Sequence, residues 1–102
     1  MTAKLTSELA LTYLAQLSVD IRAAAVIATG SDQVLSGDRA LAESAVGLFE
    51  AGTDQLCIER GDETLLGVRT ELHTVLVTAG PYVLRELLLA DLRTLLADLD
   101  ED

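Results

Sequence analysis

The spacing of hydrophobic and polar residues changes several times along the chain, and each change predicts a different secondary-structure element. Residues 6–17 carry apolar side chains at helical spacing, and Thr6 or Ser7 can cap the first turn. Residues 20–28 then alternate in the manner of a strand, but apolar side chains occupy both faces after Arg22. A strand that is apolar on both faces is typical of the interior of a sheet that is covered on two sides. The apolar positions of the first helix are Leu9, Ala10, Tyr13, Leu14 and Leu17.

The rest of the chain predicts further strands and helices separated by short turns. Asp38 is a suitable N-cap and Gly52 a suitable C-terminal stop for a second helix, whereas Pro81 suits the first turn of a third. Gly61 and Asp62 form a two-residue turn of the kind that joins antiparallel strands. The predicted strands are residues 33–36, 54–60, 63–69 and 73–79, and the predicted helices are residues 38–52 and 81–99.

The last helix combines a leucine stripe with an acidic end. Leucines recur at the spacing of one buried helix face. Negative charge at a helix C-terminus opposes the helix dipole, so we expect the acidic residues at this end to fray. The stripe consists of Leu84, Leu88, Leu92, Leu95 and Leu99, and the acidic residues are Asp98, Asp100, Glu101 and Asp102.

The order of these elements predicts an α+β fold. It runs helix, two strands, helix, three strands, helix, and short turns between consecutive strands require antiparallel pairing. We therefore expect a five-stranded antiparallel sheet with helices on both faces. At 102 residues the chain fits a single domain spanning residues 1–102, with a core over about residues 5–99 and an acidic tail at residues 100–102.

The helix predicted over residues 38–52 has more apolar surface than one sheet contact needs. At about 100° per residue its apolar side chains fill an arc of roughly 200°, interrupted only by Ser44. A helix that covers one sheet face needs an arc of about 100°. Either another helix of the same chain covers the excess, or a second copy of the chain does. The strand at residues 54–60 has no proline or lysine to protect an exposed edge, so it can pair with its own copy. The predicted dimer interface consists of Leu41, Ala45, Leu48, Phe49, Leu56 and Ile58.

The element order, the apolar pattern and three segments of the sequence resemble the Roadblock/dynein light-chain domain family. The segments are DIRAAAVIATGSDQVLSGD, DETLLGVRTELHTVLVTAG and PYVLRELLLADLRTLLADL, and the resemblance extends from about Leu5 to Leu99. In places the chain is similar to the bacterial, MglB-like members. The resemblance implies that the first and third helices cover one face of the sheet and the second helix the other. It also implies a homodimer formed through the second helix and the third strand, which binds a small Ras-like GTPase as a scaffold or regulator.

Net charge argues against several classes of partner. The chain has 7 lysines and arginines against 17 aspartates and glutamates, a net charge of −10, and its basic residues are scattered singly. Without tryptophan and with few other aromatic residues it lacks stacking platforms, so we expect no nucleic-acid binding. Anionic membranes would repel it, and no apolar run approaches the roughly 20 residues that cross a bilayer, so we expect no membrane insertion. The first residues lack a secretory profile and the single cysteine excludes an internal disulfide, which fits a cytoplasmic protein.

No group of chemically active residues predicts an enzyme, a cofactor or a metal site. His73 is the only histidine and has no ligand-like neighbours in sequence, so we expect a structural or surface role. Cys57 has no nearby histidine or second cysteine and is expected to be a small packing residue, although two copies would lie close if the third strands paired. Asp91 lies on the apolar side of the last helix, where partial exposure or an arginine partner would explain it. The hydroxyls of Ser36, Ser44 and Thr78 have no histidine base.

The glycines and arginines bear on two further roles, nucleotide binding and assistance to a partner GTPase. The glycines form no phosphate-binding loop, so we expect no nucleotide site. An arginine finger for a partner GTPase is conceivable, but surface salt bridges are the expected role of the candidates Arg39, Arg60 and Arg69. The sequence thus favours a homodimeric, non-catalytic module that binds a small GTPase. The alternative is a small-ligand sensor of the PAS or profilin-like kind, or a general scaffold, and a sensor would need a cavity with converging polar groups.

Overall fold

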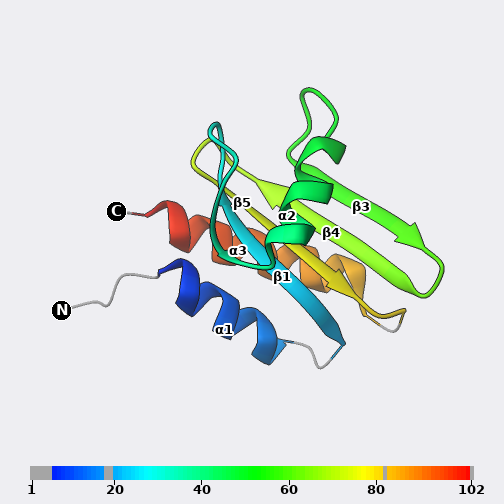
Figure 1. Cartoon of the computed structure of the whole chain (residues 1–102). Coiled ribbons are helices and arrows are strands. Elements are labelled where there is room, and N and C mark those ends of the chain that lie inside the picture. Colours follow the sequence, from blue (N-terminus) through cyan, green and yellow to red (C-terminus); the bar gives the residue numbers. More distant parts are fainter. Residues whose placement is uncertain (1–5, 18–19, 82, 102) are drawn as a thin grey trace.

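A computed structural model describes residues 6–17, 20–81 and 83–101 of the chain. Within these ranges three α-helices and one 3-10 turn pack around a single five-stranded sheet (Figure 1). The order of elements confirms the predicted α+β fold. The elements are α1 (Ser7–Leu17), β1 (Ile21–Ala28), β2 (Gln33–Gly37), α2 (Arg39–Ala45), η1 (Val46–Leu48), β3 (Gln55–Arg60), β4 (Glu63–Arg69), β5 (His73–Ala79) and α3 (Arg85–Asp100).

The sheet has the strand order β2-β1-β5-β4-β3, and all neighbouring strands are antiparallel. β1 pairs with both β2 and β5, as its two apolar faces predict. β5 occupies the centre, and Val75, Leu76 and Val77 within it are fully buried. β3 forms one edge, which agrees with its half-polar alternation.

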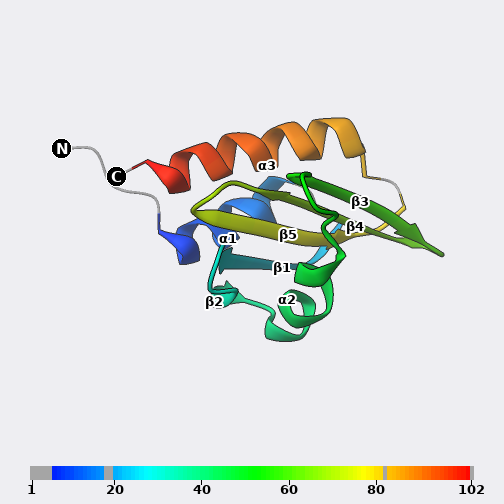
Figure 2. The same ribbon diagram turned by 90° about the horizontal axis from the view of Figure 1, so that it is seen from above.

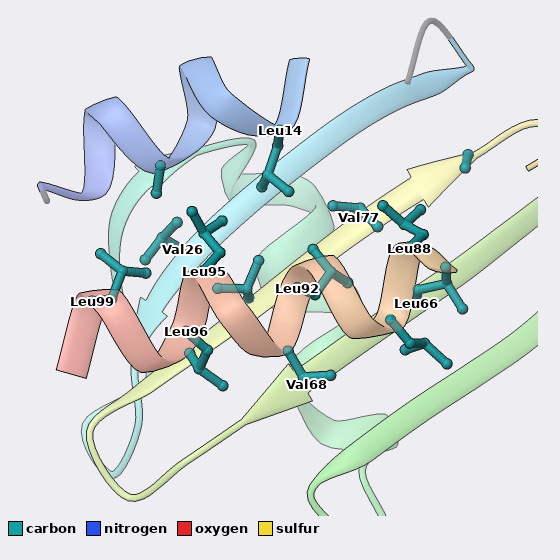
Figure 3. Packing of buried hydrophobic residues seen from close by; sticks show 14 residues of the cluster. Leu14, Val26, Leu66, Val68, Val77, Leu88, Leu92, Leu95, Leu96 and Leu99 are labelled. Atoms are coloured by element: carbon teal, nitrogen blue, oxygen red, sulfur yellow. The ribbon is translucent and has the colours of Figure 1, made fainter. Parts of the chain in front are cut away.

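Two apolar cores lie on opposite faces of the sheet. On one face, side chains of α1 and α3 such as Leu14 and Leu92 pack against Val26 of β1 and Val77 of β5 (Figure 3). On the other face, two small side chains of α2 cover the middle of the sheet, so that α2 and α3 lie on opposite sides (Figure 2). This arrangement is the one that the family resemblance implied. The second core consists of Ala25, Ile27, Ala42, Ala45, Leu56 and Leu76.

Only some of the apolar side chains of α1 are buried. The hydroxyl oxygen of Thr6 accepts a hydrogen bond from the Leu9 amide at 3.2 Å, so Thr6 caps the helix as predicted. Ala10 and Leu14 are fully buried, whereas Leu9 and Tyr13 are exposed. The remaining member of the predicted set, the side chain of Leu17, lies outside the described part of the structure.

The predicted length of the second helix, residues 38–52, is wrong, because the observed helix is shorter. Asp38 caps it as expected, because its Oδ1 accepts a hydrogen bond from the Leu41 amide at 3.1 Å. The α-helix nevertheless ends at Ala45 and continues as a single 3-10 turn, after which Phe49 is extended with φ −67° and ψ 127°. Gly47 weakens the helix locally, and the Phe49 ring packs beside Gly67 of β4. Contact with the sheet therefore ends the helix before the expected stop.

The third helix begins at Arg85, and the predicted start at Pro81 is wrong. Leu84 precedes the first turn in an extended conformation, and it is exposed rather than part of the buried stripe. The Gly80 amide donates a hydrogen bond to the Asp20 carbonyl at 2.9 Å, which extends the pairing of β5 with the start of β1. The chain therefore leaves the sheet later than the proline suggests. The other members of the stripe, Leu88, Leu92, Leu95 and Leu99, are buried as predicted.

The C-terminal turns of α3 do not fray, in contrast to the expectation for Asp98 and Asp100. Both residues are helical, and Asp100 Oδ1 lies 2.7 Å from His73 Nδ1. The two side chains are each only 22% exposed. A histidine at the start of β5 thus holds the acidic end of the helix on the sheet, which gives His73 the structural role that the sequence predicts.

We expect this contact to make a small but measurable contribution to stability. In a double-mutant cycle of His73→Ala and Asp100→Ala, the coupling free energy should be about 1 kcal/mol, because the pair is partly shielded from water. Urea unfolding of the wild type, the two single variants and the double variant would measure it. Strictly additive single substitutions would mean that the pair contributes no net stability.

Candidate functional site

A groove opens between α2 with η1 on one side and the β3–β4 hairpin on the other. Its volume is about 250 Å³, and four of its eight lining side chains are apolar. It exists because the short α2 covers the middle of the sheet and does not extend over the edge strand. One end carries two charged groups, one from the last residue of β3 and one from the first of β4. The lining residues are Leu41, Ser44, Leu48, Ile58, Arg60, Glu63, Leu65 and Thr78.

The apolar surface of α2 and η1 is only partly buried by the chain itself. Ala42 and Ala45 face the sheet and are buried, but Leu41 is half-buried and Leu48 is 40% exposed. Within the described ranges α1 and α3 both lie on the other face of the sheet. The interpretation that another helix of the same chain covers the excess is therefore wrong.

The structure separates the six residues predicted for a dimer interface into three groups. Leu41, Leu48 and Ile58 are brought together along the groove. Ala45 and Leu56 are buried in the core beneath it. The groove also contains residues that the sequence analysis did not connect with it. Arg60 follows Ile58 at a spacing of two, so the alternation of the strand was the signal that could have found it. The residues missed in this way are Ser44, Arg60, Glu63, Leu65 and Thr78.

The sixth residue, Phe49, anchors the connection between η1 and β3. The Arg69 guanidinium lies over its ring, 4.5 Å from the centroid. Arg69 Nε donates a hydrogen bond to the Thr53 carbonyl at 2.9 Å, and Nη2 donates one to the Glu50 carbonyl at 3.4 Å. The prediction that Arg69 forms a surface salt bridge is therefore wrong, because its guanidinium contacts loop carbonyls and an aromatic ring instead. Arg39 and Arg60 likewise form no ion pair with any described residue.

The backbone of β3 offers unpaired hydrogen-bonding groups at the edge of the sheet. The Arg69 amide donates to the Asp54 carbonyl at 2.9 Å, in line with a register that pairs Leu56 with Gly67 and Ile58 with Leu65. Residues of an antiparallel strand alternate in the direction of their amide groups. The even-numbered residues 54–60 therefore direct their backbone groups toward β4. Gln55, Cys57 and Glu59 direct theirs outward, where no other strand of the described residues lies.

Cys57 is exposed, so the expectation of a packing residue is wrong. It points to the same side of the sheet as α3, but α3 packs on β4 and β5 and leaves the edge strand uncovered. An arginine at the start of α3 reaches across this gap. Arg85 Nη1 lies 2.6 Å from Glu59 Oε1 and 3.9 Å from Cys57 Sγ. Asp91, on the same helix, is exposed. Of the two explanations offered for its position, exposure and an arginine partner, the structure therefore supports exposure.

The described residues contain no arrangement typical of catalysis or metal binding. Ser44 and Thr78 line the groove without a histidine beside them, since His73 contacts Asp100. The Ser36 hydroxyl, on β2, is buried and has no hydrogen-bond partner among these residues. No group of three or more His, Cys, Asp or Glu side chains in this part of the chain could hold a metal ion. None of the helices described here has the length and apolar character needed to span a membrane.

Comparison with known proteins identifies the fold. No protein-family model and no curated protein matches the sequence. Among solved structures, the chain is similar to the crystal structure of a Roadblock/LC7 domain from Streptomyces avermitilis. The TM-score is 0.71 at 17% sequence identity, and the similarity covers 95% of each chain. The chain therefore has the Roadblock/LC7 fold, which confirms the resemblance seen in the sequence.

Proposed function

We propose that this chain is a single-domain, non-catalytic interaction module that forms a homodimer in the cytoplasm and binds a small Ras-like GTPase, which it regulates or scaffolds. The observation that carries the proposal is the uncovered apolar surface of α2 and η1, which continues through the groove to the unpaired edge of β3. Exposed apolar surface next to an unprotected strand edge is typical of a protein–protein interface. The Roadblock/LC7 fold supports the same reading.

The physical chemistry of this surface supports the proposed homodimer. Leu48 and Ile58 would leave water on association, and a two-fold axis would present the same residues on both copies. A second copy can also provide a partner for a charged group at the end of the groove. Arg60 makes no ion pair with the described residues of its own chain, so an acidic group of the second copy can pair with it.

Binding of a small GTPase is supported by the family resemblance and by the shape of such a dimer. A rigid two-fold surface can select one conformation of the switch loops of a GTPase, so that the bound nucleotide sets the affinity. The net charge of −10 favours a partner with a basic face. Because contacts within the chain occupy the guanidinium of Arg69, we infer that Arg69 supplies no arginine finger to the GTPase.

Light scattering and an affinity capture test the two halves of the proposal. At micromolar concentration the purified chain should have twice its monomer mass of 10.8 kDa. The immobilised dimer should enrich one Ras-like GTPase, identified by mass spectrometry, from native-cell extracts loaded with either GTP or GDP and more strongly with one of them. A monomeric mass would contradict the dimer, and capture of no GTPase under either condition would contradict the partner.

The ligand-sensor alternative makes a different prediction. The groove, at about 250 Å³, is smaller than the roughly 300–1,000 Å³ of typical small-molecule sites. We therefore expect native mass spectrometry of the purified chain to show protein alone. A small molecule retained at one copy per chain would favour the sensor over the GTPase-binding module.

A further inference from the structure

We propose that α1 is a releasable cover of the sheet at β1 and β2, and that it leaves its place as one unit while the strands and α3 keep their structure. The inference concerns the face of the sheet opposite the groove, and it depends neither on the proposed homodimer nor on the GTPase. A helix of this kind is a conformational device built into the fold, because its position decides whether the apolar surface beneath it is accessible.

The two helices on this face differ in the polar contacts that fasten them. Arg85, the first residue of α3, lies 2.6 Å from the Glu59 carboxylate, measured from Nη1 to Oε1. Asp100, the last residue of α3, lies 2.7 Å from His73, measured from Oδ1 to Nδ1. The described residues of α1 make no hydrogen bond or ion pair with the sheet or with α3, since their hydrogen bonds all lie within the helix and its cap. Polar contacts therefore hold α3 at both ends and do not hold α1.

Apolar packing also holds α1 less firmly than α3. Six leucines of α3 are buried, whereas Ala10 and Leu14 are the only buried residues among the described side chains of α1. Leu9 and Tyr13 of the same helix are 49% and 59% exposed. Packing of an apolar face supplies most of the stability of a helix in a protein. An element with so few buried contacts opens more easily than the whole domain unfolds.

A buried hydroxyl beneath α1 makes its release easier still. Ser36 of β2 pairs with Val26 of β1, and directly opposed residues of antiparallel strands point to the same face. Val26 belongs to the core under α1 and α3, so Ser36 points to that face as well. Because α1 packs on β2 whereas α3 packs on β4 and β5, α1 is the helix that covers Ser36. The hydroxyl is buried without a hydrogen-bond partner among the described residues, and release of α1 gives it access to water.

Release of α1 uncovers a defined apolar surface. It consists of Val26 and Ala24 on β1 and of the side of α3 that carries Leu95 (Figure 3). In the closed form these side chains belong to the core that α1 and α3 share. Any molecule that binds this surface therefore competes with α1 and selects the open form.

Native-state hydrogen exchange of the full chain tests the proposal, under conditions in which exchange reports the opening equilibrium. The backbone amides of residues 10–16 should share one protection factor, at least 100-fold below that of the β5 amides of residues 75–77. Equal protection of α1 and β5 would overturn the proposal, because α1 would then open only with the whole fold. Protection that falls steadily toward the ends of α1 would also overturn it, since that pattern indicates fraying and not release as a unit.

A substitution away from α1 separates its release from global unfolding. Val68 is buried on β4, on the far side of α3 from α1 (Figure 3). Val68→Ala should speed the exchange of the β5 amides by about tenfold or more, because it removes buried methyl groups from the sheet. It should leave the exchange of the α1 amides unchanged, because α3 covers Val68 whether α1 is closed or open. Acceleration of both sets by the same factor would contradict a separate opening of α1.

Replacing Ser36 tests the contribution of the buried hydroxyl. Ser36→Ala removes a group that has no partner in the closed form, so it should raise the protection of the α1 amides by about tenfold. Ser31→Ala is the matched control, because Ser31 lies exposed in the turn between β1 and β2, and it should leave that protection unchanged. If Ser36→Ala has no effect on α1 or lowers its protection, the hydroxyl does not favour release, and this step of the proposal is overturned.

Discussion

Replacing Leu48 with glutamate is expected to dissociate the homodimer almost completely, with a dissociation constant raised by roughly 100-fold or more. In an interface of the proposed kind this side chain leaves water, and a carboxylate at the same position would be buried without a partner, at a cost of about 3 kcal/mol. Leu48 is already 40% exposed in the single chain, so the substitution should leave the fold intact. Sedimentation equilibrium across a concentration series measures the change directly.

Two further substitutions provide controls for this result. Tyr13→Glu introduces the same charge at a more exposed aromatic residue, 59% exposed on α1, which lies on the opposite face of the sheet. It should leave the dimer unchanged. Phe49→Ala removes a ring that contacts Gly67 and Arg69 of its own chain, so it should lower the free energy of unfolding by about 2 kcal/mol and affect association less than Leu48→Glu. A Leu48→Glu variant that remains dimeric would locate the interface elsewhere.

The strands could be predicted from the sequence because their signals are local. Alternation and turn residues give the bounds of β4 and β5 without error, since Gly61 fixes a two-residue hairpin and the apolar run of β5 needs an interior position. Helix ends depend on contacts that the local sequence does not contain. The early end of α2 requires Phe49 to meet Gly67, which lies on a strand that is distant in sequence. The late start of α3 depends on the backbone contact between Gly80 and Asp20.

The groove shows the same division between local and long-range information. Leu41, Leu48 and Ile58 were found by periodicity within one helix and one strand. Leu65 and Thr78 were missed because their proximity to α2 depends on the order of the strands in the sheet. The exposure of Cys57 was missed for a related reason. Its neighbours in sequence say nothing about how far α3 extends across the sheet.

Replacing Gly37 with alanine is expected to lower the free energy of unfolding by about 3–5 kcal/mol, through left-handed backbone strain and overpacking together. Gly37 ends β2 with a φ of +98°, a conformation that an alanine adopts only with strain. A Cβ atom there would lie 2.3 Å from the Ala24 carbonyl oxygen and 2.8 Å from the Ala25 Cα. Both neighbours are backbone atoms of β1, so no side-chain rotation relieves the contact and β2 has to move away from the sheet. The loss is a large part of the roughly 5–15 kcal/mol that stabilises a typical domain.

Gly30 provides a matched control for the contact made by Gly37. Its φ of +97° is almost the same, but a Cβ atom there would have no neighbour within 4 Å. Gly30→Ala should therefore cost only the conformational strain, about 1–2 kcal/mol, and the difference between the two variants isolates the clash with β1. Urea unfolding at one fixed protein concentration is the appropriate measurement, because association would otherwise contribute to the apparent stability. Equal losses in the two variants would show that β2 shifts freely and that the close approach of Gly37 to β1 is not required for the fold.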